Sequence, residues 1–273
     1  MKFVDIGVNL MNPVFDHDRE AVLAEAEAAG VRMLIITGST IESSAGALAF
    51  AQSHAGRCLA TAGVHPHNAK DWNTAALIRL RELASSDGAI AAIGECGLDY
   101  NRNFSPPDTQ RRCFEDQLIL AAQLGKPIFL HARDAFDDFL TILKRHRAGL
   151  SGAVVHCFTG GMAELEACLV LDCYIGITGW ICDERRGSHL IPLLRQIPAD
   201  RLLLETDAPY LLPRNLPRSE RRKSGRNEPC FLPHIAAFAA EIAGKPLDQI
   251  AAETNANAMR IFNFSFTIPG FRQ

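Results

Sequence analysis

The sequence predicts an α/β fold of the (β/α)8 type, the TIM barrel, with residues 1–273 forming a single domain. Short, continuously apolar runs alternate with longer amphipathic segments, a pattern typical of parallel strands that helices cover on both faces. A length of 273 residues is normal for one such barrel. A doubly wound sheet is the main alternative, but residues 7–12, which follow the first strand, lack its glycine-rich phosphate turn.

Each predicted strand is a short apolar run bounded by polar residues or glycine. The strands are expected at residues 3–8, 33–37, 58–64, 89–95, 127–131, 153–156, 173–178 and 202–206. Parallel strands that alternate with helices connect through right-handed crossovers, and eight of them over this length favour a closed barrel.

The predicted helices lie between the strands and after the last one, where apolar residues recur at helical spacing. They are expected at residues 18–29, 41–54, 75–85, 108–124, 135–146, 163–170, 188–196, 232–243 and 247–262. Gly30 and Gly125 are good C-terminal caps for two of them. The longest irregular segment, residues 208–230, follows the eighth strand, at the end where barrel enzymes hold their active sites. A loop of this length inside a compact domain is more often functional than disordered.

Four of the predicted strands end in residues that can bind a metal or move a proton. A buried charge at such a position is costly unless a metal or a set of partners compensates it. Because the carboxyl ends of the strands surround one mouth of a barrel, Glu95, His131, His156 and Asp207 are expected to converge. A single histidine of this kind is more often a satisfied core residue, but four such ends favour a metal site. Mixed nitrogen and oxygen ligands suit Zn²⁺, Mn²⁺, Fe²⁺ or Mg²⁺.

The bulk composition narrows the classes of partner. A net charge of −3 provides no overall attraction to nucleic acid, so such binding would need local cations or a metal. No apolar stretch reaches the roughly 18–20 residues that span a membrane, and the N-terminus does not resemble a secretory signal. The eight cysteines are scattered, as expected of a protein of the reducing cytoplasm. No obligate protein partner is evident.

Several motifs of the chain resemble those of the TatD family of metal-dependent deoxyribonucleases. They occur in the family's order and are spread over nearly the whole chain. The motifs are Gly63-Val64-His65-Pro66-His67, Gly94-Glu95-Cys96-Gly97-Leu98-Asp99-Tyr100, His131-Ala132-Arg133-Asp134-Ala135, His156-Cys157-Phe158-Thr159-Gly160, Glu205-Thr206-Asp207-Ala208-Pro209-Tyr210 and Arg226-Asn227-Glu228-Pro229.

The resemblance implies an amidohydrolase-type barrel that hydrolyses phosphodiesters with a metal-activated water. It implies a 3′-5′ exonuclease acting on the 3′ ends of single-stranded DNA, with RNA as a further substrate. Mg²⁺ would be the usual ion, with Mn²⁺ or Zn²⁺ able to replace it. Glu95, His131 and His156 would be metal ligands. Asp207 would be a further ligand or the residue that orients and deprotonates the water, assisted by Glu205.

The end of the first strand departs from the pattern of many family members. Gly7 and Asn9 stand where those members carry a His-x-His pair that helps to hold a second metal. One branch of the family shares this start, so the departure does not by itself indicate an inactive enzyme. The candidates for a weak second metal site are then Asp5, Asn9 and Asp207.

Cations near the mouth are expected to hold the substrate. His65, His67, Arg133 and Arg214 are the candidates for phosphate contacts, although Arg214 fits a solvated loop equally well. An aromatic side chain can stack on the terminal base. The candidates lie on loops after the predicted strands, and packing is the commoner role for each of them: Tyr100, Phe104, Trp180 and Tyr210.

Two other functions remain open at this point. The same barrel and ligands could hydrolyse a small ester or amide, or aminoacyl-tRNA, but many such enzymes carry the His-x-His pair and a carboxylated lysine. The chain has neither the pair nor a lysine at the end of its fourth strand. A non-catalytic metal-binding or assembly protein would not need the motifs around His156 and Asp207.

Overall fold

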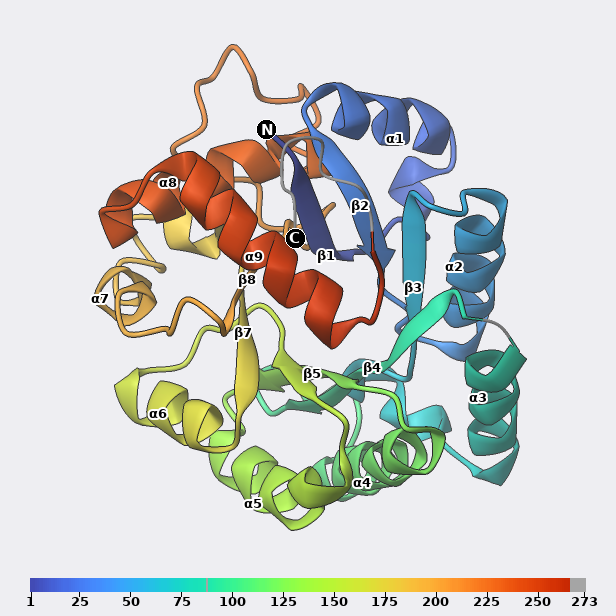
Figure 1. Ribbon diagram of the computed structural model, residues 1–273. Helices are drawn as coiled ribbons and strands as arrows, with labels where there is room; N and C mark the ends of the chain where they lie inside the picture. The colour runs from blue at the N-terminus through green and yellow to red at the C-terminus, as the bar shows by residue number, and fades with distance from the viewer. Residues whose placement is uncertain (87, 266–273) are drawn as a thin grey trace.

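The computed structural model describes residues 1–86 and 88–265. Eight parallel strands form one sheet in which each strand pairs with the next in the sequence (Figure 1). A parallel bridge between Val8 and Ala208, beyond the last strand, joins the two edges and confirms the predicted barrel. The strands are β1 (Phe3–Val8), β2 (Val31–Ile36), β3 (Cys58–Ala62), β4 (Ile90–Asp99), β5 (Ile128–Arg133), β6 (Ala153–Val155), β7 (Cys173–Ile177) and β8 (Leu202–Leu204).

Helices follow the strands and surround the barrel, close to the predicted positions. They are α1 (Arg19–Ala28), α2 (Ile41–Ser53), α3 (Thr74–Ser86), α4 (Pro107–Leu124), α5 (Phe136–His146), α6 (Met162–Val170), α7 (Leu190–Leu194), α8 (Leu232–Ala243) and α9 (Leu247–Ile261). Short 3-10 helices lie in the loops at η1 (Pro13–Phe15), η2 (Pro66–Asp71), η3 (Arg147–Gly149), η4 (Gly179–Cys182) and η5 (Pro229–Phe231). Gly125 ends α4 in the left-handed conformation, with φ 63°, as its capping role predicts.

The core has two layers. A large apolar cluster lies between the strands and the surrounding helices, and a second cluster fills the barrel. The second cluster includes Ile6, Phe129 and Leu203 from the strands together with Ile261 and Phe262 from the C-terminal end of α9. Helix α9 crosses the end of the barrel that faces the viewer in Figure 1. It therefore closes the end opposite the carboxyl ends of the strands.

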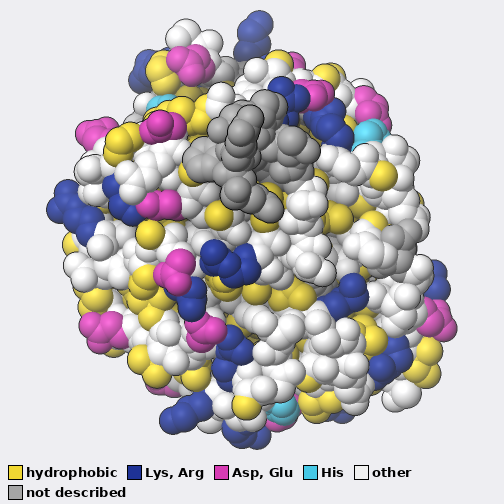
Figure 2. All heavy atoms as spheres, viewed as in Figure 1, with side chains coloured by type: hydrophobic (Ala, Val, Ile, Leu, Met, Phe, Trp, Pro, Cys, Tyr) yellow, Lys and Arg dark blue, Asp and Glu magenta, His cyan; other side chains and the backbone are white. Residues whose placement is uncertain are grey.

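The closed end of the barrel has a mixed surface. Lysine and arginine side chains are interspersed with aspartate and glutamate over the face shown in Figure 2. Interspersed charges produce no extended field of one sign. An anionic polymer would therefore have to be attracted elsewhere on the molecule. Within the described ranges, no helix is long and apolar enough to cross a membrane.

Strand β4 differs from its prediction and shapes the site. It was expected to end at Glu95, but it continues to Asp99. The pairing with β5 shifts between Ile93 and Cys96, and the Glu95 backbone N–H instead donates to the Gly38 carbonyl at 2.8 Å. Gly94 has φ 128° and lies so close to the Phe129 carbonyl that a side chain would collide with it. Glycine therefore permits the irregular strand that presents Glu95 to the barrel mouth.

Candidate active site

A cavity of about 470 Å³ opens at the carboxyl ends of the strands. Glu95, His131, His156 and Asp207 all line it, so the structure brings the predicted set together. These residues come from β4, β5 and the segments that follow β6 and β8. Their convergence explains why polar side chains follow buried strands in the sequence.

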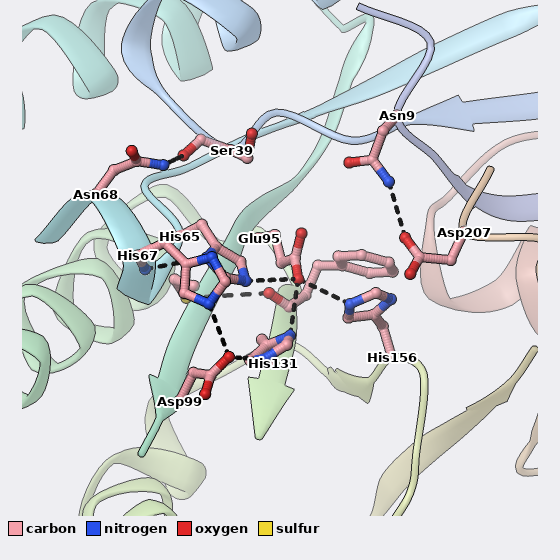
Figure 3. A network of polar contacts seen from close by, with 12 residues as sticks. Asn9, Ser39, His65, His67, Asn68, Glu95, Asp99, His131, His156 and Asp207 are labelled. Carbon is pink, nitrogen blue, oxygen red and sulfur yellow. Dashed lines mark hydrogen bonds and ion pairs between the residues drawn. The ribbon is translucent and has the colours of Figure 1, made fainter. Parts of the chain in front are cut away.

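Glu95 lies at the centre of three imidazole rings (Figure 3). Its Oε1 is 2.8 Å from His156 Nε2, 3.0 Å from His131 Nδ1 and 3.4 Å from His65 Nε2. Burial raises the pKa of the Glu95 carboxyl, but the surrounding imidazoles outweigh burial and hold it well below its usual range. Glu95 is therefore an anion around which ring nitrogens gather.

This arrangement fits a divalent cation. His65, Glu95 and His131 each offer one ligand atom, and these atoms lie within 4.8 Å of one another. His131 Nε2 is buried and has no hydrogen-bond partner in the part of the chain that the structure describes. Imidazole nitrogen together with carboxylate oxygen is a donor set of Zn²⁺, Mn²⁺ and Fe²⁺ sites, and carboxylate oxygen suits Mg²⁺. His65 was expected to contact phosphate, but it lies with Glu95 and His131 among the residues that can hold a metal.

Asp99 holds the outer side of this cluster. Its Oδ2 is 2.7 Å from His67 Nε2 and 3.6 Å from His131 Nε2. Burial opposes ionisation of Asp99, but the two imidazoles outweigh it and keep the pKa of this carboxyl below its usual range. Asp99 belongs to the fourth-strand motif, yet no role was predicted for it. Its position four residues after Glu95 on a parallel strand was the available signal.

Asp207 lies on the other side of His156, next to Asn9 (Figure 3). Asn9 Nδ2 donates to Asp207 Oδ1 at 2.8 Å, and the Asp207 backbone N–H donates to the Gly7 carbonyl at 2.8 Å. Burial raises the pKa of Asp207 to about 7, although His156 opposes the shift. Asn9, predicted as a weak metal ligand, therefore orients Asp207.

Glu205 is a correction to the prediction, which placed it beside the reacting groups. It is fully buried behind His156, where its Oε2 accepts from His156 Nδ1 at 3.1 Å and its Oε1 accepts from the Cys157 backbone N–H at 2.5 Å. A side chain at Gly7 would meet this carboxylate. Glu205 thus fixes the orientation of the His156 ring, as carboxylates commonly do for metal-binding histidines.

Asp5 is a second correction. It was predicted to contribute to a weak second metal site, but it is fully buried and does not line the cavity. Its carboxylate accepts from Thr206 Oγ1 at 2.5 Å and from the Thr206 backbone N–H at 3.0 Å. Burial raises the pKa of Asp5 to about 7. These bonds join β1 to the segment that follows β8, and they leave Asn9 and Asp207 as the remaining candidates for a second metal position.

The predicted phosphate-binding cations divide into two groups. His67 and Arg133 line the cavity, but Arg214 does not. Arg214 Nε instead lies 3.7 Å from Asp183, a buried carboxylate that also binds Arg186. The prediction that Arg214 contacts phosphate is therefore corrected, because its guanidinium lies beside Asp183 and outside the cavity.

Two further arginines, which were not predicted, add positive charge to the lining of the cavity. Arg102 and Arg186 line the cavity, and Arg186 lies over the ring of Trp180, with 4.5 Å between its Cζ and the ring centroid. Arg133 Cζ is 5.7 Å from the same centroid. Among the described residues, neither Arg102 nor Arg133 has a carboxylate partner for its guanidinium. Unpaired cations beside a metal-type cluster favour an anionic ligand.

The candidate stacking residues differ in how free their aromatic rings are. Trp180 is engaged with guanidinium groups, and the Tyr100 hydroxyl donates to Asp138 at 2.7 Å, outside this cavity. Tyr210 lines the cavity and is 53% exposed. Phe104 is 58% exposed and packs edge-on against the His67 ring, with 4.8 Å between centroids. Tyr210 and Phe104 therefore have the freer rings.

A (β/α)8 barrel with a buried carboxylate–imidazole cluster at its carboxyl end defines the class of metal-dependent barrel hydrolases. The β-aspartyl dipeptidase of Fervidobacterium islandicum AW-1 shows the same fold, with TM-score 0.61 and 12% identity over 96% of this chain and 75% of that one. The model of the family described as "TatD related DNase" matches residues 4–263. The chain therefore belongs to the TatD family.

Individual relatives are similar over nearly their whole length. The "3'-5' ssDNA/RNA exonuclease TatD" of Erwinia amylovora is 53% identical over 258 residues, or 94% of this chain and 98% of that protein. The protein of the same name from Edwardsiella piscicida is 53% identical, covering 96% of this chain and 100% of its own. Among solved structures, the TatD homologue YJJV of Escherichia coli has TM-score 0.88 and 29% identity, covering 96% of this chain and 98% of that one.

Proposed function

We propose that this protein is a metal-dependent 3′-5′ exonuclease that removes nucleotides from single-stranded DNA and RNA. The observation that carries the proposal is one cavity that combines the Glu95 cluster with the unpaired guanidinium of Arg133. The names of the similar proteins from Erwinia amylovora and Edwardsiella piscicida supply the polarity and the substrate. Opposed charges of this kind suit a phosphodiester held next to a cation.

The chain's residues would divide the work as follows. Glu95, His131 and His156 would hold the ion, with His65 adjacent and Glu205 fixing His156. When bound, the ion would neutralise charge on a phosphate oxygen and lower the pKa of a water molecule, with Mg²⁺ as the proposed physiological choice and Mn²⁺ or Zn²⁺ as substitutes.

Asp207 would take the proton of the attacking water. Asn9 occupies its Oδ1, which leaves Oδ2 to accept that proton. Arg133 and His67 would bind phosphate oxygens, and Arg102 would take the role first assigned to Arg214. Tyr210 or Phe104 would support the terminal base.

We also propose that residues 1–273 act as one catalytic domain in the cytoplasm. All eight cysteines are free thiols, which suits a reducing compartment.

The first prediction tests metal dependence and polarity together. EDTA is expected to reduce cleavage of an end-labelled single strand to background, and added Mg²⁺ is expected to restore it, because the cavity needs a cation to neutralise the phosphate. A strand with a blocked 3′-terminal linkage should resist, whereas its 5′-blocked counterpart should be degraded. Cleavage that persists in EDTA would contradict the metal mechanism, and degradation of the 3′-blocked strand would contradict the polarity.

The second prediction separates the two arginines that were assigned to phosphate. Arg133→Ala should raise KM about tenfold or more, because one charge-assisted hydrogen bond to phosphate contributes roughly 1.5–3 kcal/mol. It should also reduce the slope of log affinity against log salt by about 0.7 for a single strand. Both quantities can be measured by titrating an oligonucleotide at several salt concentrations.

Arg214→Ala is the matched control, because it removes the same side chain from outside the cavity. Its KM and its salt slope should remain those of the wild type. Equal effects of the two substitutions would contradict the assignment of phosphate binding to Arg133 and not to Arg214.

A further inference from the structure

We propose that Asn227 is a positioning residue that holds Asp207 in its working conformation. We further propose that Arg226 and Glu228 fasten this residue to α1. The Arg226-Asn227-Glu228-Pro229 motif is one of the family-like motifs of the sequence, but the proposed reaction does not use it. The inference rests on the proposed function, because it concerns the orientation of the proposed base.

Asn227 forms a bridge around Asp207. Its side chain is fully buried, and Nδ2 donates to the Thr206 carbonyl at 2.9 Å and to the Tyr210 carbonyl at 2.7 Å. Its backbone N–H donates to the Pro209 carbonyl at 3.0 Å. One side chain thus binds the residue before Asp207 and the residue that ends the turn after it. Within the segment 206–210, Asp207 and Tyr210 line the cavity.

The turn needs such a bridge. Asp207 has φ 53° and Leu211 has φ 58°, both in the left-handed region. This region costs an ordinary L-residue roughly 1–2 kcal/mol, and aspartate tolerates it better than leucine does. Conformations of this kind persist where surrounding contacts fix them. The two carbonyls held by Asn227 are contacts that fix this one.

The bridge is anchored to the outer helix α1. The Asn227 Oδ1 accepts from the Glu228 backbone N–H at 2.9 Å, and the buried Glu228 carboxylate binds Arg226 at 2.8 Å and Arg222 at 2.6 Å. Arg226 continues to Asp18, with 2.6 Å between Nη2 and Oδ2. Opposite charges on both sides of Arg226 therefore tie the loop to the start of α1.

Asn257 provides a matched comparison at the start of β8, whereas Asn227 binds the segment that follows the end of this strand. It is also a buried asparagine whose Nδ2 binds two carbonyls, of Ala199 at 2.8 Å and of Leu202 at 2.9 Å. It lies in α9, at the closed end of the barrel, and does not line the cavity. Both asparagines therefore bind two carbonyls through Nδ2, but only Asn227 binds carbonyls on both sides of Asp207.

The test compares Asn227→Ala with Asn257→Ala in the oligonucleotide assay, at a temperature where thermal denaturation shows both to be folded. Both should lose stability, because each loses the two hydrogen bonds that its Nδ2 donates to backbone carbonyls. Only Asn227→Ala should lower kcat, by about 10- to 100-fold, the effect expected of a misplaced catalytic group, with little change in KM. In an Asp207→Asn background, Asn227→Ala should cost no more than about twofold, since coupled residues are not additive.

If Asn227→Ala does not fold, Arg226→Lys supplies the milder variant. It keeps the charge but loses the forked contact with Asp18 and Glu228, and it should lower kcat in the same direction. Equal kcat values for the Asn227 and Asn257 variants, or full additivity with Asp207→Asn, would overturn the inference. An inactive wild type would instead overturn the proposed function, and the two failures are therefore distinct.

Discussion

Replacing Glu95 by glutamine is expected to abolish metal-dependent cleavage and also the stabilisation that a bound metal provides. Glu95 Oε1 is the atom on which three ring nitrogens converge, and glutamine removes its charge while keeping its size. A lost cation site removes several kcal/mol of transition-state stabilisation, which corresponds to a fall in kcat/KM of about 10³-fold or more. Oligonucleotide cleavage and calorimetric titration with Mn²⁺ would measure the two effects.

Stability supplies a readout that does not depend on catalysis. A ligand that binds only the native state raises the melting temperature, by an amount that grows with the logarithm of its concentration relative to its Kd. Added metal should therefore raise the melting temperature of the wild type but leave that of Glu95→Gln nearly unchanged.

Glu115→Gln is the matched control for Glu95→Gln. Glu115 also binds a histidine, with 2.8 Å between its Oε1 and His146 Nε2, but on the outer helices and away from the cavity. This variant should keep wild-type cleavage and the wild-type response to metal. A Glu95→Gln protein that still bound the ion tightly would exclude Glu95 from the metal site.

The sequence was sufficient to predict the barrel and the convergence of Glu95, His131, His156 and Asp207, for one physical reason. A parallel strand that is buried on both faces leaves a clear apolar run, and the barrel then places the carboxyl ends of all strands around one mouth. A residue's position along such a run therefore fixes its approximate place in space. The family resemblance added the chemistry to that geometry.

The direction of each side chain could not be predicted in the same way. Asp5 lies within β1 and Glu205 directly follows β8, but their side chains face Thr206 and His156 instead of the cavity. Which face a polar side chain takes depends on partners from other strands, and those partners become known only from the tertiary structure. The ion pair of Arg214 could not be predicted for a related reason, because Asp183 lies more than thirty residues earlier in the chain.

Asp207→Asn is expected to leave the fold and substrate binding almost intact while removing most of the turnover. Asparagine tolerates the left-handed conformation at this position, and its Oδ1 can still accept from Asn9 Nδ2. What it loses is the ability to take a proton, and general base catalysis contributes about 10²- to 10⁴-fold to rate. We therefore expect kcat to fall by that factor with little change in KM, measured on a single-stranded oligonucleotide at saturating metal.

Asp172→Asn controls for the substitution itself. Asp172 also has a left-handed backbone, with φ 54°, but it lies in an exposed loop where it binds Arg201 and Arg147. Its replacement removes only exposed ion pairs, which contribute about 0–1 kcal/mol, so turnover should not change. A rise in KM at constant kcat in Asp207→Asn would instead make Asp207 a binding group. Loss of metal affinity in the same variant would make it a ligand, so this one substitution decides between the two roles that the sequence left open for Asp207.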